Sequence, residues 1–235
     1  MGPDCGTAII DGAVLGFANA VPRGPVGVIG ASGTGIQEFT VLLDRLAGLG
    51  ISQAIGLGGR DLSQDVGGMS ASRALALLRD DPGTECVAFI SKPPAPEVAA
   101  AIGREAEAVG KPVVFCLLEP GKPAAEEGGA IIRVNSLEEA AVRTLALCGR
   151  HPAVPLPSSE EIWALGKNLA GRLSPGQKSV RGIFSGGSLC LEAMAHLAPV
   201  LGNRFSNIRM PGVQPLGPFQ GSGHCFWDMG DDEFT

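Results

Sequence analysis

The feature that most constrains this fold is an alternation of short apolar runs with helix-like stretches. Residues 26–31 (VGVIGA) form a nearly continuous apolar run, which is typical of a strand buried on both faces. Four further strands are expected at residues 51–57, 85–90, 112–118 and 130–134. Between and after them, helices are expected at about residues 33–49, 70–79, 96–109 and 137–148. This order predicts an α/β fold, a doubly wound parallel sheet over about residues 24–150.

A proline-rich segment, residues 151–158, is the clearest domain boundary. Beyond it, residues 158–161 (SSEE) indicate a helix start, because Ser caps and early Glu favour the positive end of the helix dipole. A strand at 180–184, a helix at 189–201 and a late strand at 224–229 follow. We expect this segment to be too small to close a sheet, so that residues 159–235 form a partial second α/β unit.

Composition excludes several classes of protein. The formal net charge is −6, from 18 Lys and Arg against 24 Asp and Glu, which does not fit a nucleic-acid partner. Glycine, proline or charge interrupts every apolar run before about 18 residues, so no membrane partner is expected. Six cysteines without a CxxC pair predict neither a disulfide scaffold nor zinc, and thus a reduced, cytoplasmic protein. His151 is expected to be exposed and His196 packed, and no metal site is expected.

Two glycine turns between a strand and a helix are the main candidates for chemistry. The first unpaired N–H groups of such a helix, with its dipole, bind anions such as phosphate. The alternative is that any parallel sheet needs glycine at these turns and that Ser or Thr merely caps the helix. The candidate phosphate-binding residues are Ser32, Gly33, Thr34, Gly35, Ser185, Gly186, Gly187 and Ser188.

A second group of candidates follows the strand at residues 51–57, at the edge where α/β sheets bind ligands. The alternative is a solvated turn, and the acidic run near the carboxyl terminus is interpreted as a solvated end. Spacing argues against three known motifs: the dinucleotide fingerprint, the Walker A loop and the nucleophile elbow. The candidates for this edge of the site are Gly58, Gly59, Arg60 and Asp61, and further acidic candidates are Glu38, Glu119, Asp228, Asp231, Asp232 and Glu233.

Several segments resemble the succinyl-CoA synthetase superfamily. Residues 1–6 resemble the end of the CoA-binding domain of its α subunits, and residues 30–34 with Glu38 are similar to the helix start that points at their phosphohistidine. Residues 54–59 and 81–85 resemble α-subunit turns, and residues 184–188 resemble a β-subunit loop. Within the superfamily, the chain resembles FdrA-type acyl-CoA synthetase-like proteins, on ISQAIGLGGRDL, VRGIFSGGSLC and DMGDDEFT.

The resemblance implies a flavodoxin-like, succinyl-CoA synthetase-like domain at residues 24–150, with residues 1–23 as the remnant of a CoA-binding domain. CoA is therefore not expected as a ligand. One departure changes the implied chemistry: where the α subunits carry their phosphohistidine, residues 126–130 read EEGGA, and residues 91–93 lack the orienting glutamate. Phosphoryl transfer through such a histidine is thus excluded.

The resemblance also implies a role in allantoin and purine catabolism, as a subunit of an oxamate carbamoyltransferase. In this hypothesis the two loops hold phosphate or carbamoyl phosphate from opposite sides, without a recognisable general base. Two alternatives stay open: a subunit of an ADP-forming acyl-CoA (succinyl-CoA) ligase, and a non-catalytic assembly or regulatory subunit. The expected partners are other subunits of a multi-subunit enzyme, or a second copy in a homodimer.

Overall fold

The computed structural model describes residues 5–118, 126–128, 131–216, 223–231 and 234. The chain divides into two compact units, Met1–His151 and Pro152–Thr235. The division falls in the proline-rich segment, and each unit is described by itself. Among the described residues, none of the helices combines the length and the apolar character needed to cross a bilayer.

The first unit is built on an eight-stranded sheet in the order β2-β1-β4-β3-β5-β6-β8-β7. Its middle five strands are parallel, as predicted, and their ends lie within three residues of the predicted ones. They are β3 (Arg23–Gly30), β4 (Ile51–Gly56), β5 (Cys86–Ser91), β6 (Val113–Leu117) and β8 (Ile131–Val134).

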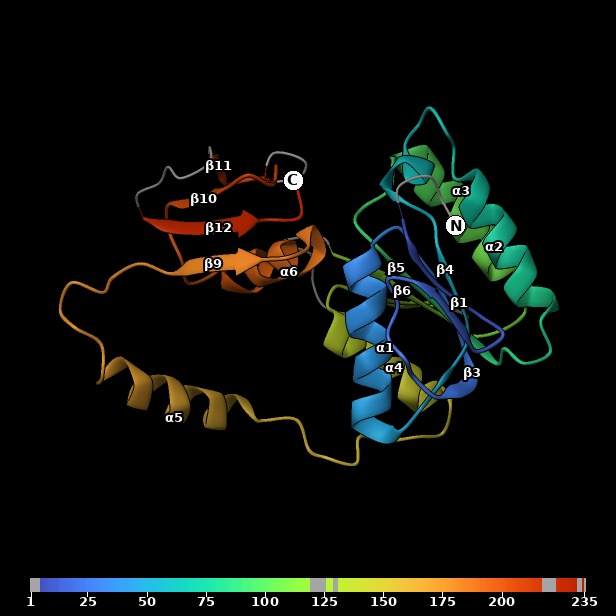
Figure 1. Cartoon of the computed structure of the whole chain (residues 1–235), viewed down its shortest axis with the longest axis horizontal. Helices are drawn as coiled ribbons and strands as arrows, with labels where there is room; N and C mark the ends of the chain where they lie inside the picture. Colours follow the sequence, from blue (N-terminus) through green and yellow to red (C-terminus); the bar gives the residue numbers. More distant parts are fainter. Residues whose placement is uncertain (1–4, 119–125, 129–130, 217–222, 232–233, 235) are drawn as a thin grey trace. The chain divides into compact units, whose positions relative to one another are not determined.

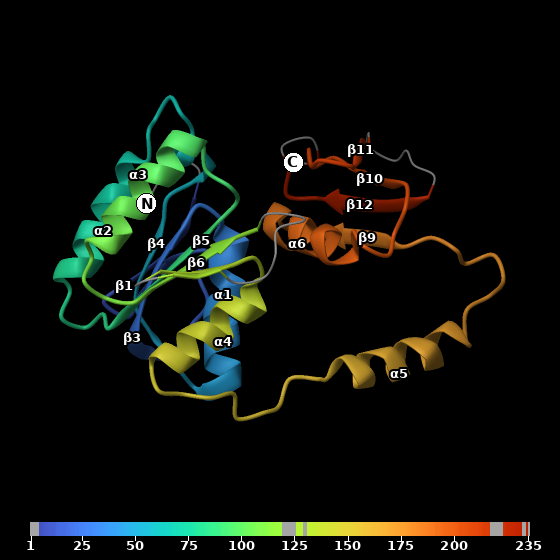
Figure 2. The ribbon, with the colours of Figure 1, turned by 180° about the vertical axis from the view of Figure 1, so that it is seen from behind.

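Helices cover both faces of this sheet, which makes it doubly wound. On one face α1 (Gly33–Ala47) packs against α4 (Leu137–Leu147). On the other face α2 (Met69–Asp80) packs against α3 (Pro96–Glu107), and a short 3₁₀ helix η1 (Gly59–Leu62) precedes α2. Figures 1 and 2 show the two helix pairs from opposite sides. Because both faces are covered, the central strands bury apolar side chains in both directions.

The core beneath α2 and α3 is centred on the aromatic pair Phe89 and Phe115. Their rings stack with centroids 4.9 Å apart, on the neighbouring strands β5 and β6. Leu75, Leu78 and Ile102 close over them from the two helices. The apolar runs of the sequence therefore become strands because each buries its side chains against one of the two helix layers.

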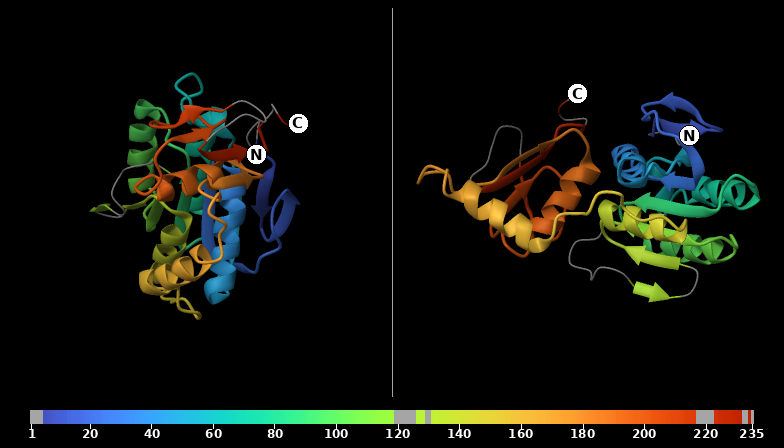
Figure 3. Two further views of the ribbon diagram at one scale, coloured as in Figure 1. Left: turned by 90° about the vertical axis from the view of Figure 1, so that its left-hand side faces the viewer. Right: turned by 90° about the horizontal axis from the view of Figure 1, so that it is seen from below.

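The edges of the sheet hold strands that the sequence analysis missed. A hairpin of β1 (Thr7–Ile10) and β2 (Ala13–Gly16) adds antiparallel to β4, and β7 (Glu126–Gly128) adds at the opposite edge. The right-hand view of Figure 3 shows both edges. The hairpin turns at Asp11 and Gly12, both at positive φ. An Asp-Gly pair between two apolar runs is the sequence signal that indicates such a hairpin.

The second unit has a sheet of its own, so the expectation that this segment is too small to close one is wrong. Four parallel strands lie in the order β11-β10-β12-β9. Two of them were not predicted, because strands of three and two residues in a Gly- and Pro-rich tail carry no periodicity. The elements are α5 (Ser159–Ala170), β9 (Arg181–Phe184), α6 (Gly187–Leu197), β10 (Arg204–Ser206), β11 (Gln214–Pro215) and β12 (His224–Asp228).

The position of His196 corrects another expectation. Its side chain is 65% exposed rather than packed, and it lies 3.9 Å from Glu192 on the same helix. The buried face of α6 is set by Ser188, Leu191 and Met194. At about 100° per residue, His196 is turned about 200° from Met194 and so points to solvent. His151 is exposed, as predicted.

Replacing Phe89 with alanine tests the core of the first unit. Phe89→Ala should lower the free energy of unfolding by about 3–5 kcal/mol, because it removes a fully buried ring and its stacking partner loses contact. Urea unfolding followed by far-UV circular dichroism measures the loss. Both tryptophans lie in the second unit, so their fluorescence reports that unit separately. The exposed Leu77→Ala on α2 is the control, and an equal effect of both changes would contradict the assignment of this core.

Candidate functional site at the carboxyl edge of the first sheet

The parallel strands of the first unit define where a ligand would bind. Across the sheet they lie in the order β4-β3-β5-β6-β8, which is 2-1-3-4-5 in chain order. After β3 the chain enters α1 on one face, and after β4 it enters α2 on the other. The winding therefore reverses between β3 and β5, and open α/β sheets bind ligands outside the carboxyl ends of such strands. The first glycine turn follows β3 at this point.

Ser32 shapes this turn as the N-cap of α1. It lies buried, and its Oγ accepts a hydrogen bond from the Gly35 N–H at 2.9 Å, while its carbonyl accepts one from the Ile36 N–H. Helix geometry leaves the N–H groups of Gly33 and Thr34 without an acceptor inside the helix. Those two residues are partly exposed. Of the four predicted residues, Ser32 and Gly35 thus hold the turn, and Gly33 and Thr34 face outward.

Close packing explains why glycines stand in this turn. A Cβ on Gly33 would lie 2.9 Å from Thr7 Oγ1, and one on Gly30 would lie 2.6 Å from the side chain of Ile36. The alternative that packing in the sheet requires these glycines is therefore supported for Gly30 and Gly33. It does not account for the charges around the turn.

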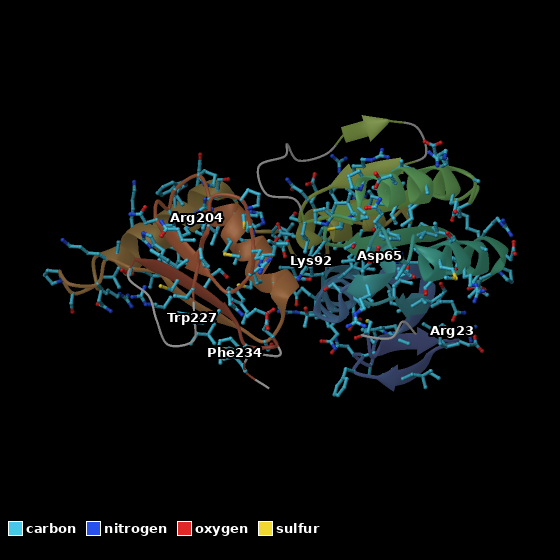
Figure 4. The ribbon with its side chains drawn as sticks, turned by 90° about the horizontal axis from the view of Figure 1, so that it is seen from above. Arg23, Asp65, Lys92, Arg204, Trp227 and Phe234 are labelled. Carbon is cyan, nitrogen blue, oxygen red and sulfur yellow. The ribbon has the colours of Figure 1, made fainter. Side chains whose placement is uncertain are left out.

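Lys92 is a residue that the sequence analysis did not single out. It follows β5 directly and is exposed (labelled in Figure 4). Since Gly30 pairs with Ile90, Ser32 and Lys92 stand at the same distance along adjacent strands. The charged Lys92 side chain therefore lies at the same edge of the sheet as the start of α1. In the sequence, a lysine and two prolines follow the end of this strand. This pattern indicates a candidate for the site only when β3 and β5 are known to be neighbours.

The second group of candidates lies beside this edge, after β4. Gly58 adopts φ 86°, a conformation that favours glycine, and Gly59 and Arg60 are exposed. Asp61 is 2% exposed, and its two carboxylate oxygens accept hydrogen bonds from the N–H groups of Ser70 and Ala71 at 2.8 and 2.9 Å. Asp61 thus caps the start of α2 instead of standing in a solvated turn. A role in the site remains a prediction for the other three.

The second glycine turn has the same design in the second unit. It joins β9 to α6, whose N-cap is Gly186, with Ser185 exposed and Ser188 buried. β9 pairs with β12, which places Asp228 at the end of the neighbouring strand. The Asp228 carboxylate accepts a hydrogen bond from the Gly230 N–H at 3.0 Å, so this acidic candidate closes a turn. That the two glycine turns face one ligand remains a prediction.

Helix starts across the chain differ in charge, and this separates the two glycine turns from the rest. α3, α4 and α5 carry Glu in their first turn, and α2 has the Asp61 carboxylate. Of the α-helices in the described ranges, α1 and α6 begin with no acidic residue in the first turn and no side-chain carboxylate as cap. The positive dipole ends of α1 and α6 are thus not balanced by an acid of their own first turn.

The remaining acidic candidates do not gather into a site. Glu38 is partly buried on α1, whereas Glu119, Asp232 and Glu233 lie outside the described residues. Within the part of the chain that the structure describes, no group of three His, Cys, Asp or Glu side chains has the arrangement of a metal site. Anion binding by backbone N–H groups and a lysine remains a prediction for this edge of the sheet.

Comparison with known proteins shows which proteins parts of this chain resemble. Residues 23–117 match the model of the CoA binding domain family. The chain is 44% identical over 237 residues to the uncharacterized protein YahF of Escherichia coli, covering all of this chain and 45% of that protein. It is 36% identical over 117 residues to the malate–CoA ligase subunit alpha of Methylorubrum extorquens, covering 48% of this chain and 38% of that subunit.

Among solved structures, the chain is similar to a dinucleotide-forming acetyl-coenzyme A synthetase of Ca. Korarchaeum cryptofilum, with a TM-score of 0.46 at 20% identity. That match covers 85% of this chain and 42% of the synthetase chain. The chain thus spans less than half the length of the relatives that it matches. The FdrA type appears in none of these names.

The family match covers the middle part of the first unit. Residue 23 begins β3 and residue 117 ends β6, so the matched segment contains the strands on both sides of the winding reversal and the loop of Ser32, Gly33 and Thr34. The match does not support the expectation that CoA is no ligand of this chain, because residues 23–117 match the model of a CoA binding domain. The resemblance to CoA ligases is confirmed at this coarser level.

Asp61 offers a direct test of its assignment as a cap. Asp61→Ala should lower the free energy of unfolding by about 1–3 kcal/mol, because the N–H groups of Ser70 and Ala71 lose their acceptors near a buried helix start. Urea unfolding measures the loss. Asp65→Ala, an exposed carboxylate in the same connection, is the matched control. If the Asp61 variant were as stable as the control, the cap would be wrong and a ligand role for this carboxylate would regain support.

Proposed function

We propose that the first unit is the anion-binding part of a subunit of an acyl-CoA ligase-like enzyme, and that the start of α1 binds a phosphate group of its substrate. The observation that carries this proposal is the α1 start itself. It lies at the winding reversal of a CoA-binding-family domain, has no acidic residue in its first turn, and stands beside Lys92.

In this proposal the N–H groups of Gly33 and Thr34 donate hydrogen bonds to phosphate oxygens. The Lys92 ammonium balances the remaining charge, and Ser32 keeps the turn in shape through its bond to Gly35. These groups are fixed before the ligand arrives, so little reorganisation opposes binding or the stabilisation of an oxyanion. Ser185, Gly186, Gly187 and Ser188 form the second anion site on α6.

Two enzyme classes fit this chemistry. We favour a carbamoyltransferase that uses carbamoyl phosphate, as in the oxamate carbamoyltransferase reaction of allantoin and purine catabolism. Carbamoyl transfer to or from phosphate needs an anion site but no phosphohistidine, and the EEGGA segment at 126–130 supplies none. The other candidate is an ADP-forming acyl-CoA ligase subunit, with CoA held through its phosphates. The family match and the similarity to the malate–CoA ligase subunit favour it.

The proposed setting is a multi-subunit enzyme in the cytoplasm. Similarity to a protein named as an alpha subunit supports the assembly. So does the amphipathic helix α5, because none of its residues is buried and Ile162, Trp163 and Leu165 are exposed. A second copy of this chain remains the simplest partner to consider.

A charge placed at the start of α1 tests the site. Thr34→Asp should weaken binding of carbamoyl phosphate by about tenfold or more, because it fills the dipole end with a fixed negative charge. The same charge favours the helix, so the variant should be at least as stable as the wild type. Calorimetric titration with inorganic phosphate, carbamoyl phosphate and CoA gives the affinities, and thermal unfolding gives the stability.

Three further variants make the result specific. Lys92→Gln should weaken binding of the same ligands, and Ser185→Asp shows whether the second turn takes part. Ser159→Asp adds the same net charge to the first turn of α5, which already carries two glutamates, and should change nothing. Carbamoyl phosphate binding more tightly than CoA supports carbamoyl transfer, and the reverse supports a ligase. Wild-type affinity in Thr34→Asp, or no binding to the wild type, would refute the site.

A further inference from the structure

Two cysteines that are far apart in the sequence meet in the first unit. Cys86 is the first residue of β5, and Cys148 is the C-cap of α4. Their Sγ atoms lie 3.2 Å apart across 62 positions of sequence. A disulfide bond is about 2.05 Å long, so the two sulfur atoms are already in contact and need to approach by only about 1 Å.

The surroundings of the two thiols differ in a way that suits sequential reaction. Cys86 is 2% exposed, whereas Cys148 is partly exposed at the end of its helix. The other four cysteines, Cys5, Cys116, Cys190 and Cys225, are buried. A dissolved reagent can therefore reach Cys148 first, and the thiol standing directly behind it belongs to Cys86.

We propose that Cys86 and Cys148 are a site of reversible oxidation, which forms a disulfide between β5 and the end of α4. A disulfide oxidant of the glutathione type is the co-reactant. This site is independent of the anion site, and nothing in its chemistry depends on the function proposed above.

The electrostatics assign the roles of the two thiols. A hydrogen bond from the Cys86 thiol lowers the pKa of the Cys148 thiol, against burial and Glu85, and Arg150 lowers it further. The same interaction, with burial, raises the pKa of the Cys86 thiol. Since the thiolate is the nucleophile, Cys148 attacks first and Cys86 resolves.

The reaction balances in two exchanges. The Cys148 thiolate attacks one sulfur of glutathione disulfide, so that a mixed disulfide forms and one glutathione thiolate leaves. Cys86 then releases its proton to solvent and attacks Cys148 Sγ, which expels the second glutathione thiolate. The protein loses two electrons and two protons, and the oxidant is reduced to two glutathione molecules.

The disulfide would link the end of α4 to the start of the central strand β5. Cys148 is the C-cap of α4, and Gly149, at φ 64°, and Arg150 follow it in the segment that precedes the second unit, which begins at Pro152. Joining it to a central strand closes a long loop of chain. Because such a link restricts the unfolded chain, oxidation should raise the resistance of the first unit to unfolding.

The experiment oxidises the whole chain with glutathione disulfide and reads mass and melting temperature. The wild type should become lighter by two hydrogens, yield a peptide that links Cys86 to Cys148, and melt about 5–10 °C higher, all reversed by dithiothreitol. Cys86→Ser should instead stop at a stable glutathione adduct on Cys148. Cys148→Ser should show neither the adduct nor the shift.

Cys116→Ala is the matched control, because Cys116 is buried in the neighbouring strand β6 and its removal leaves the pair intact. It should keep the mass change and the melting shift. A wild type that stays reduced, or that retains the glutathione adduct on Cys148 without forming the linked peptide, would overturn the proposal. The peptide map of the wild type decides this even if a serine variant fails to fold.

Discussion

Burial of the parallel sheet on both faces is the constraint on which the first unit depends. A parallel strand cannot leave one face to water without exposing its apolar side chains, so the chain must supply helices to both sides. The helix after β3 covers one face and the helix after β4 covers the other, so the winding reverses between β3 and β5, where open α/β sheets bind ligands. The place of the candidate site is therefore a consequence of how the core is covered, before any side chain contributes chemistry.

Local sequence signals were enough for elements that bury continuous apolar runs or begin with a good cap. β3, β5 and α1 were predicted for this reason, and the α/β class followed from their order. The signals failed where structure depends on partners distant in sequence. β10 and β11 are too short to show a period, and they form because β10 pairs with β12 and β11 pairs with β10. The turn at Asp11 and Gly12 is different, because an Asp-Gly pair between apolar runs is a local signal for a hairpin.

The candidate site shows the same division. The two glycine turns could be found from sequence, because strand, glycine and helix follow one another directly. Lys92 could not, since it joins the site only through the pairing of β3 with β5. Asp61 looked like a candidate ligand because of its position after β4, but its oxygens hold the start of α2, nine and ten residues further on. Contacts across such distances in sequence are what a single sequence does not display.

Charge, more than glycine, carries the information about ligands in this protein. Each glycine of the first turn has a packing reason, since Thr7, Ile36 and Ser32 occupy the space that a Cβ would need. A purely structural turn would still gain from an acid at the helix start, as α3, α4 and α5 do. The first turns of α1 and α6 carry no acid and lack this stabilising interaction. The phosphate site that we propose therefore depends on this difference in acidic residues between the helix starts, and not on the glycines.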